Sequence, residues 1–219
     1  MKVIKSTVEP LFFPDRETLY GLIETAGRTC YQSEKVEGDT TEKFIQRLMK
    51  RKHWSVLEHA NLSIRFTCDR GVTHELVRHR IASYSQESTR YCNYAGDKFG
   101  GGEIKFIDLA TGFNYDLSNP GDLAKYGVWA RAMEDAEKYY MEMLKIGATP
   151  QEARSVLPNS TKTEIVVTMN VREWRHFLEM RWVGVAGTPH PQMVEVAEEV
   201  YNLLNYYYPA LFGDIKKAK

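Results

Sequence analysis

The chain has 219 residues, which suits one compact domain, and its 29 Lys and Arg side chains balance 29 Asp and Glu side chains. Because the formal net charge is zero, no overall positive field favours binding to a nucleic acid or to a membrane surface. No apolar stretch approaches the roughly 20 residues of a membrane helix, and the first residues lack the apolar core of a signal peptide, so we expect a cytoplasmic protein.

Periodicity and capping residues predict alternating strands and helices in the first half of the chain. A short edge strand is expected to stop before Pro10 and Pro14, because proline cannot donate to a sheet. Asp39 and Glu42 have the spacing of a capping box at the start of a helix. The predicted elements are a strand at 2–8, helices at 15–31 and 39–52, an alternating strand at 62–67 and a helix at 72–81.

In the second half, hydroxyl side chains make 83–94 too polar to predict a regular element, and Gly96 with Gly100–Gly102 predicts a mobile loop. Thr149 and Glu152 form another capping box. The predicted elements are helices at 122–146 and 150–157, a strand at 163–169, helices at 171–183 and 192–208, and a frayed tail at 216–219. The longest helix should face the core through Leu123, Tyr126, Ala130, Met133, Tyr140, Met141 and Leu144.

Several common sites are not indicated by the sequence. The three cysteines are widely spaced without a Cys-x-x-Cys pair, so we predict reduced thiols rather than disulfides or a thiolate zinc site. The histidines lack the i, i+4 pairing of a zinc helix, and we expect no metal site. Neither a Gly-x-Gly-x-x-Gly turn nor a Walker sequence is present, so any nucleotide is held by another kind of cradle.

The segment 78–91 gathers three arginines, a histidine and four Ser and Thr hydroxyls. Guanidinium groups stay protonated, so they can hold phosphate or stabilise developing negative charge but cannot act as general bases. A helix would place Glu75, Arg78 and His79 on one face, which favours function over the alternative of a solvated, salt-bridged surface. Ser88 has no imidazole beside it in sequence, so we expect it to hydrogen-bond a ligand or, alternatively, to cap the local turn.

The sequence Arg78-His79-Arg80, followed after seven residues by Ser88, resembles the signature of the flavin-dependent thymidylate synthases. The likeness continues through 54–59, 153–158, 170–172 and 177–181, and covers most of the chain outside 99–121 and the termini. It implies methylation of dUMP to dTMP with 5,10-methylenetetrahydrofolate as carbon donor and NADPH as reductant through FAD. It also implies a single α/β (α+β) domain over 1–219, with a central mostly antiparallel sheet flanked by helices. These protomers would form a homotetramer whose active sites are shared between subunits.

The resemblance also assigns site residues. Arg181 would be the catalytic residue, because a permanent cation against the uracil ring would stabilise negative charge at N3 and O4 and make C5 more nucleophilic. The residues implied to bind or border the FAD cofactor are Ser55, Glu58, Arg78, His79, Arg80, Gln86, Asn170, Arg172 and His176. The residues implied to bind dUMP are Glu75, Arg78, Gln86, Glu87, Ser88, Thr89, Arg90, Arg154 and Arg181. The phosphate dianion suits Arg90 and Arg154.

Three places depart from the usual pattern of the family. His176 stands where Asn is more common, Ser85-Gln86 where Asn-Glu is common, and Glu75 where Gln is frequent. Because a carboxylate would repel a phosphate, Glu75 is expected to orient Arg78 or to accept hydrogen bonds from the ribose hydroxyl or the uracil.

Alternatives to these assignments stay open. Arg172 and Arg181 could instead be surface residues of an amphipathic helix. The closer rival function is another nucleotide-binding flavoprotein, which would have no need for dUMP. A nucleic-acid-binding module is the other rival, and it would show a broader basic patch and salt-dependent affinity for a polymer.

Overall fold

The structure is a computed structural model that describes residues 1–96 and 101–217. Gly100 of the predicted mobile loop and the last two residues of the predicted frayed tail lie outside the described residues. The chain divides into two compact units. Unit 1 comprises Met1–Thr7, Phe66–Arg78 and Ser85–Ile165, and unit 2 comprises Val8–Arg65, His79–Tyr84 and Val166–Lys219. The expectation of one domain over the whole chain stays a prediction.

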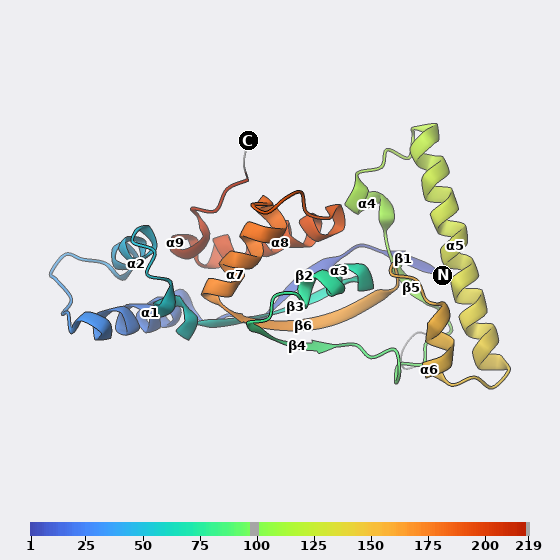
Figure 1. Cartoon of the computed structure of the whole chain (residues 1–219), viewed down its shortest axis with the longest axis horizontal. Helices are drawn as coiled ribbons and strands as arrows, with labels where there is room; N and C mark the ends of the chain where they lie inside the picture. The colour runs from blue at the N-terminus through green and yellow to red at the C-terminus, as the bar shows by residue number, and fades with distance from the viewer. Residues whose placement is uncertain (97–100, 218–219) are drawn as a thin grey trace. The chain divides into compact units, whose positions relative to one another are not determined.

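A four-stranded sheet has the order β2-β3-β6-β4 (Figure 1). Its strands are β2 (Thr7–Phe12), β3 (Asn61–Asp69), β6 (Lys162–Asn170) and β4 (Ala82–Gln86). Buried and half-buried residues alternate along β3 and β6, which confirms the strands predicted at 62–67 and 163–169. A second sheet in unit 1 pairs β1 (Lys2–Ile4) in parallel with β5 (Lys105–Ile107), a strand that the sequence did not predict.

Three predictions near these strands are wrong. The strand expected at 2–8 is two strands, and β2 continues through Pro10, because an edge strand tolerates a residue without an N–H. The hydroxyl-rich 83–94 contains β4, whose alternating half-buried and exposed residues suit the other edge of the sheet. Helix α3 (Arg70–Leu76) ends earlier than expected, because the N–H of Arg78 bonds back to the carbonyl of Glu75, and so Arg78 and His79 share no helix face with Glu75.

In unit 1, the long helix α5 (Pro120–Lys145) confirms the prediction at 122–146. Met133 and Tyr140 are buried with Tyr94, Ile104 and Phe106, whereas Leu123 is 52% exposed and not core-facing as expected. The apolar cluster contacts α5 only from Trp129 onward, which explains the difference. The capping box predicted at Thr149 and Glu152 begins α6 (Pro150–Ala153), which passes into the short 3-10 helix η2 (Arg154–Val156); α4 (Leu109–Phe113) was not predicted.

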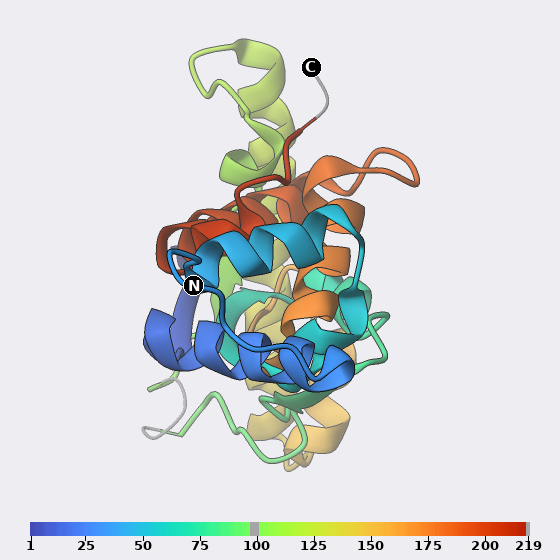
Figure 2. The ribbon, with the colours of Figure 1, turned by 90° about the vertical axis from the view of Figure 1, so that its left-hand side faces the viewer.

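In unit 2, α1 (Arg16–Tyr31) and α2 (Thr41–Lys50) pack side by side (Figure 2). Asp15 caps α1, and the cap of α2 is Thr40 rather than Asp39. Asp39 instead forms an ion pair with Arg47, so its carboxylate is not available to the helix N-terminus. A 3-10 helix, η1 (Trp54–His59), precedes β3.

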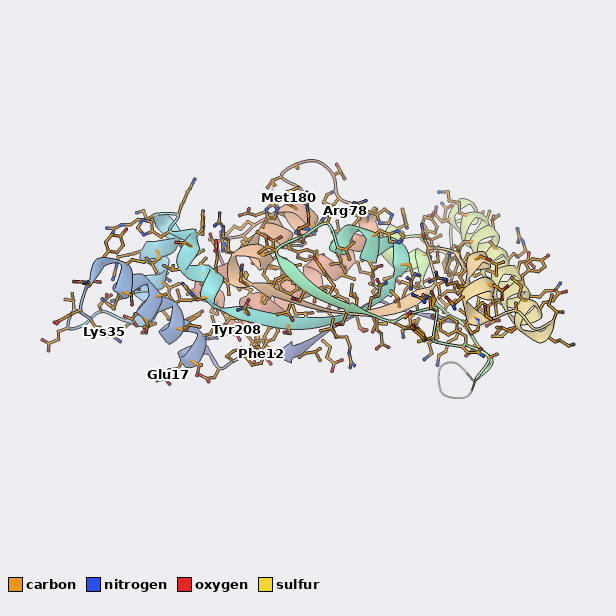
Figure 3. The ribbon with its side chains drawn as sticks, turned by 60° about the horizontal axis from the view of Figure 1, so that its bottom comes forward. Phe12, Glu17, Lys35, Arg78, Met180 and Tyr208 are labelled. Atoms are coloured by element: carbon orange, nitrogen blue, oxygen red, sulfur yellow. The ribbon has the colours of Figure 1, made fainter. Side chains whose placement is uncertain are left out.

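The C-terminal part of unit 2 contains α7 (Val171–Leu178), η3 (Glu179–Val183), α8 (Pro191–Tyr207) and a short α9 (Pro209–Phe212). The helix predicted at 171–183 has the right extent, but its last five residues form a π-helical turn, which Met180 marks in Figure 3. Gly184 ends this turn at φ 81°, where a Cβ would lie 2.8 Å from the carbonyl oxygen of Gly187. Trp174 is fully buried, and its indole N–H donates to the carbonyl of Leu62 in β3.

Over the described ranges, no helix combines the length and apolar character that a membrane crossing requires. Cys30, Cys68 and Cys92 are free thiols, and burial raises the pKa of the Cys68 thiol.

Candidate functional site

A pocket of about 470 Å³ opens in unit 2, a volume within the usual range for small-molecule sites. Four of the residues predicted to bind or border FAD line it: Glu58, Asn170, Arg172 and His176. Its other lining residues are Trp54, Ile81, Glu173, Arg175 and Glu179. The structure thus brings together residues that lie more than a hundred positions apart in the sequence.

The junction of β6 and α7 builds one wall of this pocket. Asn170 ends the strand and caps the helix, because its side-chain oxygen accepts the N–H of Glu173 at 2.8 Å. Arg172 and His176 are four residues apart, so they share one exposed face of α7. Buried Trp174 and Phe177 fix the other face. Arg175 is also buried and forms an ion pair with Asp214 at 2.7 Å, which ties α7 to the C-terminal segment.

His79 lies against this helix. Its Nδ1 is 3.0 Å from Oε1 of Glu173, and the Nε of Arg181 donates to its Nε2 at 3.3 Å. The ring packs edge-on against Phe177 and His176, with centroids 5.3 and 5.6 Å away. The backbone carbonyl of His79 accepts the hydroxyl of Tyr84. The predicted catalytic arginine and the central histidine of the Arg-His-Arg sequence are therefore in direct contact.

Burial dominates the protonation of this histidine. Only 5% of His79 is exposed, and desolvation lowers its pKa below the usual value, more than the hydrogen bond to Glu173 raises it. The charges of Arg181 and His176 lower the pKa further. His79 is accordingly neutral at pH 7.

The ligand atoms of His79, Glu173 and His176 lie within 4.8 Å of one another, so these residues could hold a metal ion. This cluster was not predicted from the sequence, because His79 comes from a different segment than α7. Both ring nitrogens of His79 already have hydrogen-bond partners, and a metal would have to displace one of them. We therefore interpret the cluster as a hydrogen-bonded network, and the expectation of no metal stays a prediction.

Arg172 forms an ion pair with Glu58 at the edge of the pocket. Ser55, the other predicted FAD residue on η1, lines an adjoining pocket of about 370 Å³ that shares Trp54 and Arg172. Arg80 is exposed and has no acidic partner among the residues that the structure describes. It lines neither pocket, although its neighbour Ile81 lines the first.

The residues predicted to bind dUMP fall mostly in unit 1. Gln86 is half-buried, and its amide donates to the hydroxyls of Thr73 at 3.1 Å and Thr163 at 3.3 Å. The carboxylate of Glu87 accepts from Lys162 and from the Tyr94 hydroxyl, each at 2.9 Å. Both side chains thus have partners within the unit, and these partners were not visible as neighbours in the sequence.

The turn after Glu87 gathers the other predicted dUMP residues. The carbonyl of Ser88 accepts the N–H groups of Tyr91 and Cys92, and its hydroxyl is 3.4 Å from the N–H of Arg90, a long contact that agrees in part with a turn-capping role. Arg154, from η2, is 3.4 Å from the hydroxyl of Thr89. The Nε of Arg90 donates to Gln151 at 3.1 Å. The structure therefore brings Arg90 and Arg154 to the same end of unit 1 as Thr89.

Glu75 and Arg78 lie at the end of α3, also in unit 1, where the carbonyl of Glu75 accepts the N–H of Arg78. The sequence missed Glu173 and Lys162, the two residues that hold predicted site residues in place. A signal for Glu173 exists: it is a carboxylate on the side of α7 that also carries Trp174 and Phe177, which are buried. For Lys162, which begins a strand, no such signal is present.

Known proteins resemble this chain in sequence and in fold. A family model described as thymidylate synthase complementing protein matches residues 17–210. The flavin-dependent thymidylate synthase of Geobacter sulfurreducens is 33% identical over 213 residues, which cover 92% of this chain and 82% of that protein. That of Mycobacterium sp. strain JLS is 38% identical over 178 residues, which cover 76% and 69%.

A crystal structure of the UMP/dUMP methylase PolB from Streptomyces cacaoi, bound with 5-Br dUMP, superposes with a TM-score of 0.79 at 22% identity. The match covers 97% of this chain and 96% of that chain. It confirms the mixed α/β fold with a mostly antiparallel sheet. The matched family model and the relatives of high coverage agree with the Arg-His-Arg-x7-Ser sequence, and this chain belongs to the flavin-dependent thymidylate synthase family.

Proposed function

We propose that the protein methylates dUMP to dTMP, with 5,10-methylenetetrahydrofolate as carbon donor and NADPH as reductant through bound FAD. The observation that carries this proposal is the contact between Arg181 and buried, neutral His79 beside the unit 2 pocket. That contact connects a permanent cation, through the signature residue His79, to Glu173 and His176, which line the pocket.

The residues of the unit 2 pocket fit a flavin nucleotide. Arg172 supplies a cation for the pyrophosphate, and Asn170 supplies an amide that can hydrogen-bond the polar edges of the ring. Trp54 and Ile81 supply apolar surface for a planar ring system. His176 adds a hydrogen-bonding group where relatives more often have Asn, and it retains one donor in its neutral form. We assign Ser55, Glu58, His79 and Arg80 to the same ligand, with Arg78 and Gln86 as further contacts. When bound, FAD would transfer the reducing electrons to the methylene group.

The unit 1 cluster fits the nucleotide monophosphate. Arg90 and Arg154 contact only neutral side chains through the hydrogen bonds described above, so their charges are available to a phosphate dianion. The hydroxyls of Ser88 and Thr89 lie beside them. The proposed dUMP set is completed by Glu75, Arg78, Gln86 and Glu87. Glu87 would contribute by shaping the turn, because its carboxylate already accepts hydrogen bonds from Lys162 and Tyr94.

In the proposed reaction, C5 of dUMP would form a bond to the methylene carbon while the bonds from that carbon to the folate nitrogens break and tetrahydrofolate leaves. A proton would leave C5, and two electrons with a proton, supplied by NADPH through FAD, would reduce the methylene to methyl. Arg181 is assigned to the uracil ring, where its charge stabilises the negative charge that develops at O4 and N3. It cannot take the C5 proton, because a guanidinium is protonated at any ordinary pH.

We also propose a homotetramer in which neighbouring subunits share active sites. The proposal accounts for exposed apolar side chains next to predicted site residues, namely Ile81 at 67% and Tyr91 at 73% exposure. Sedimentation velocity of the flavin-loaded protein tests it, and a monomer at micromolar concentration would contradict it.

The function is tested by purifying the protein and recording its visible spectrum before and after incubation with FAD. We expect bound flavin, and we expect dUMP to change the rate at which NADPH is oxidised. A protein that stays colourless after reconstitution would contradict the assignment. A flavin-containing protein whose rate of NADPH oxidation does not change when dUMP is added would favour the alternative of another nucleotide-binding flavoprotein.

A further inference from the structure

We propose that Glu173 is a positioning residue that fixes the tautomer of His79 and thereby holds the guanidinium of Arg181 in place. The proposal deepens the proposed function, because it rests on Arg181 acting on the substrate. Its starting observation is a chain of three side chains in unit 2, in which the imidazole of His79 lies between a buried carboxylate and a guanidinium.

The contact with Arg181 shows which tautomer of His79 is present. Arg181 can only donate, so the Nε2 of His79 that lies 3.3 Å from its Nε must carry a lone pair. A neutral imidazole has one N–H, which must then be on Nδ1, 3.0 Å from Oε1 of Glu173. Because burial lowers the pKa of His79, the imidazolium form does not compete at pH 7. Glu173 is therefore the acceptor that selects the form of His79 able to bind Arg181.

The backbone positions Glu173 and Arg181, the two residues that flank His79 in this hydrogen-bonded series. Glu173 is 7% exposed in the first turn of α7, where its N–H bonds to the Asn170 side chain. Arg181 follows eight residues later, in the π-helical turn, whereas residues that pair directly on a helix are three or four apart. The His79 ring bridges this gap. Gly184 ends the π-helical turn at a position that has no room for a Cβ. The turn, and with it the backbone position of Arg181, is thereby fixed.

Replacement of Glu173 by glutamine tests the proposal, because it keeps the size but removes the charge. An amide can rotate to present its NH2 group to Nδ1, which would move the histidine proton to Nε2 and set it against the N–H of Arg181. The guanidinium would then shift, and a displacement of about 1 Å at a reacting group costs about a hundredfold in rate. We expect kcat for release of the C5 proton of dUMP to fall by about tenfold to a hundredfold in Glu173→Gln.

The first measurement, the tautomer of His79, does not depend on enzymatic activity. In full-length protein with 15N-labelled histidine, we expect His79 at pH 7 to show a protonated Nδ1 and a bare Nε2. An Nε2–H tautomer or an imidazolium in the wild type would overturn the proposal, whether or not the protein methylates dUMP. This measurement also keeps the proposal testable if Glu173→Gln does not fold.

The second readout is the KM and kcat for C5 proton release in Glu173→Gln, with Glu24→Gln as the matched control. Glu24 is a buried glutamate of unit 2 with 8% exposure that pairs with Arg28, and neither residue lines the two pockets described above. We expect a lower kcat and a loss of the Nδ1–H tautomer in Glu173→Gln alone, with the KM for dUMP little changed. An unchanged tautomer and kcat in Glu173→Gln would overturn the proposal. Wild-type protein that has the expected tautomer but releases no proton would contradict the proposed function instead.

Discussion

The two clusters of predicted site residues are held in different ways. In unit 2, charged side chains of the pocket are paired with other charged or buried groups, as in Glu173, His79 and Arg181 or in Glu58 and Arg172. In unit 1, Arg90 and Arg154 contact neutral groups at 3.1 and 3.4 Å, and neither has an acidic partner within the described ranges. Under the proposed function, the paired groups of unit 2 would orient Arg181 toward the uracil ring, whereas the arginines of unit 1 would offer positive charge to the phosphate dianion of dUMP.

The largest effect is expected from Arg181→Ala. We propose that Arg181 stabilises the negative charge that develops on the uracil ring. Loss of the guanidinium should therefore lower kcat for C5 proton release by about a hundredfold to a thousandfold. FAD retention, measured by visible absorbance per protein, should stay close to that of wild type. Arg51→Ala, at an exposed arginine of the same unit, serves as control. Equal loss of flavin and of methylation in Arg181→Ala would contradict the assigned role.

A second variant addresses unit 1. Arg154→Ala removes a cation assigned to phosphate, and charged hydrogen bonds contribute about 1.5–3 kcal/mol, so the KM for dUMP should rise by about tenfold to a hundredfold. The flavin content should not change. Arg131→Ala, at an exposed arginine on α5, is the matched control. If Arg154→Ala lost its FAD while its KM for dUMP stayed normal, the division of tasks between the units would be wrong.

Arg80→Ala tests the proposed FAD site of unit 2. We assign Arg80 to FAD, and its exposed position gives solvent screening, so we expect FAD to bind about tenfold more weakly. Titration of the apoprotein with FAD measures this change. With saturating FAD, the KM for dUMP should match that of wild type; a variant that keeps its flavin but loses dUMP affinity argues against the assignment.

The pH dependence tests the neutral state of His79. Burial lowers its pKa below the usual 6.5, so at pH 6.5 most His79 side chains keep a bare Nε2 that accepts from Arg181, and this acceptor is lost as pH falls through the lowered pKa. Protonation would place an N–H and a positive charge against Arg181, with His176 adding to the repulsion and Glu173 opposing it. We expect kcat to be level from pH 8 to 6.5 and to fall at lower pH by up to about tenfold per pH unit. A fall that begins above pH 7 would contradict a lowered pKa.

The same shift has a consequence for folding. The unfolded chain takes up a proton at His79 first as pH falls, so the contribution of this group to stability is present above pH 6.5 and lost as pH falls through its folded pKa. Urea unfolding of wild type and His79→Gln between pH 7.5 and 5.5 measures it. The variant should show the weaker pH dependence.

The smallest effect on catalysis is expected from Lys162→Met. Burial lowers the pKa of Lys162, but hydrogen bonds with Glu164 and Glu87 outweigh it and raise the pKa. Loss of the ammonium leaves the half-buried Glu87 with one unpaired oxygen, which should destabilise the protein by about 1–3 kcal/mol in urea unfolding. Kinetic constants at saturating FAD should change little. A large rise in the KM for dUMP would mean that Glu87 contacts the ligand directly.

Local patterns in the sequence were enough to predict most helices and the two central strands. The alternation in β3 and β6 and the Thr149 capping box are properties of a few adjacent residues, and the structure confirms them. Strand β4 depends on pairing with a distant strand, which outweighs local composition, and α3 ends in a turn in which the N–H of Arg78 bonds to the carbonyl of Glu75. The same limit applies to the site. Arg172 and His176 were predicted through the family resemblance. Glu173 stands out in the sequence only as a carboxylate on the apolar side of α7, and its partner His79, 94 residues away, is identified by the structure alone.

The most direct test of the central claim is release of the C5 proton from dUMP labelled with tritium at C5, in the presence of FAD, NADPH and 5,10-methylenetetrahydrofolate. We predict tritium release that depends on all three and that accompanies formation of dTMP, with both lost together in Arg181→Ala. Flavin-loaded protein that oxidises NADPH but releases no tritium from dUMP would contradict the account.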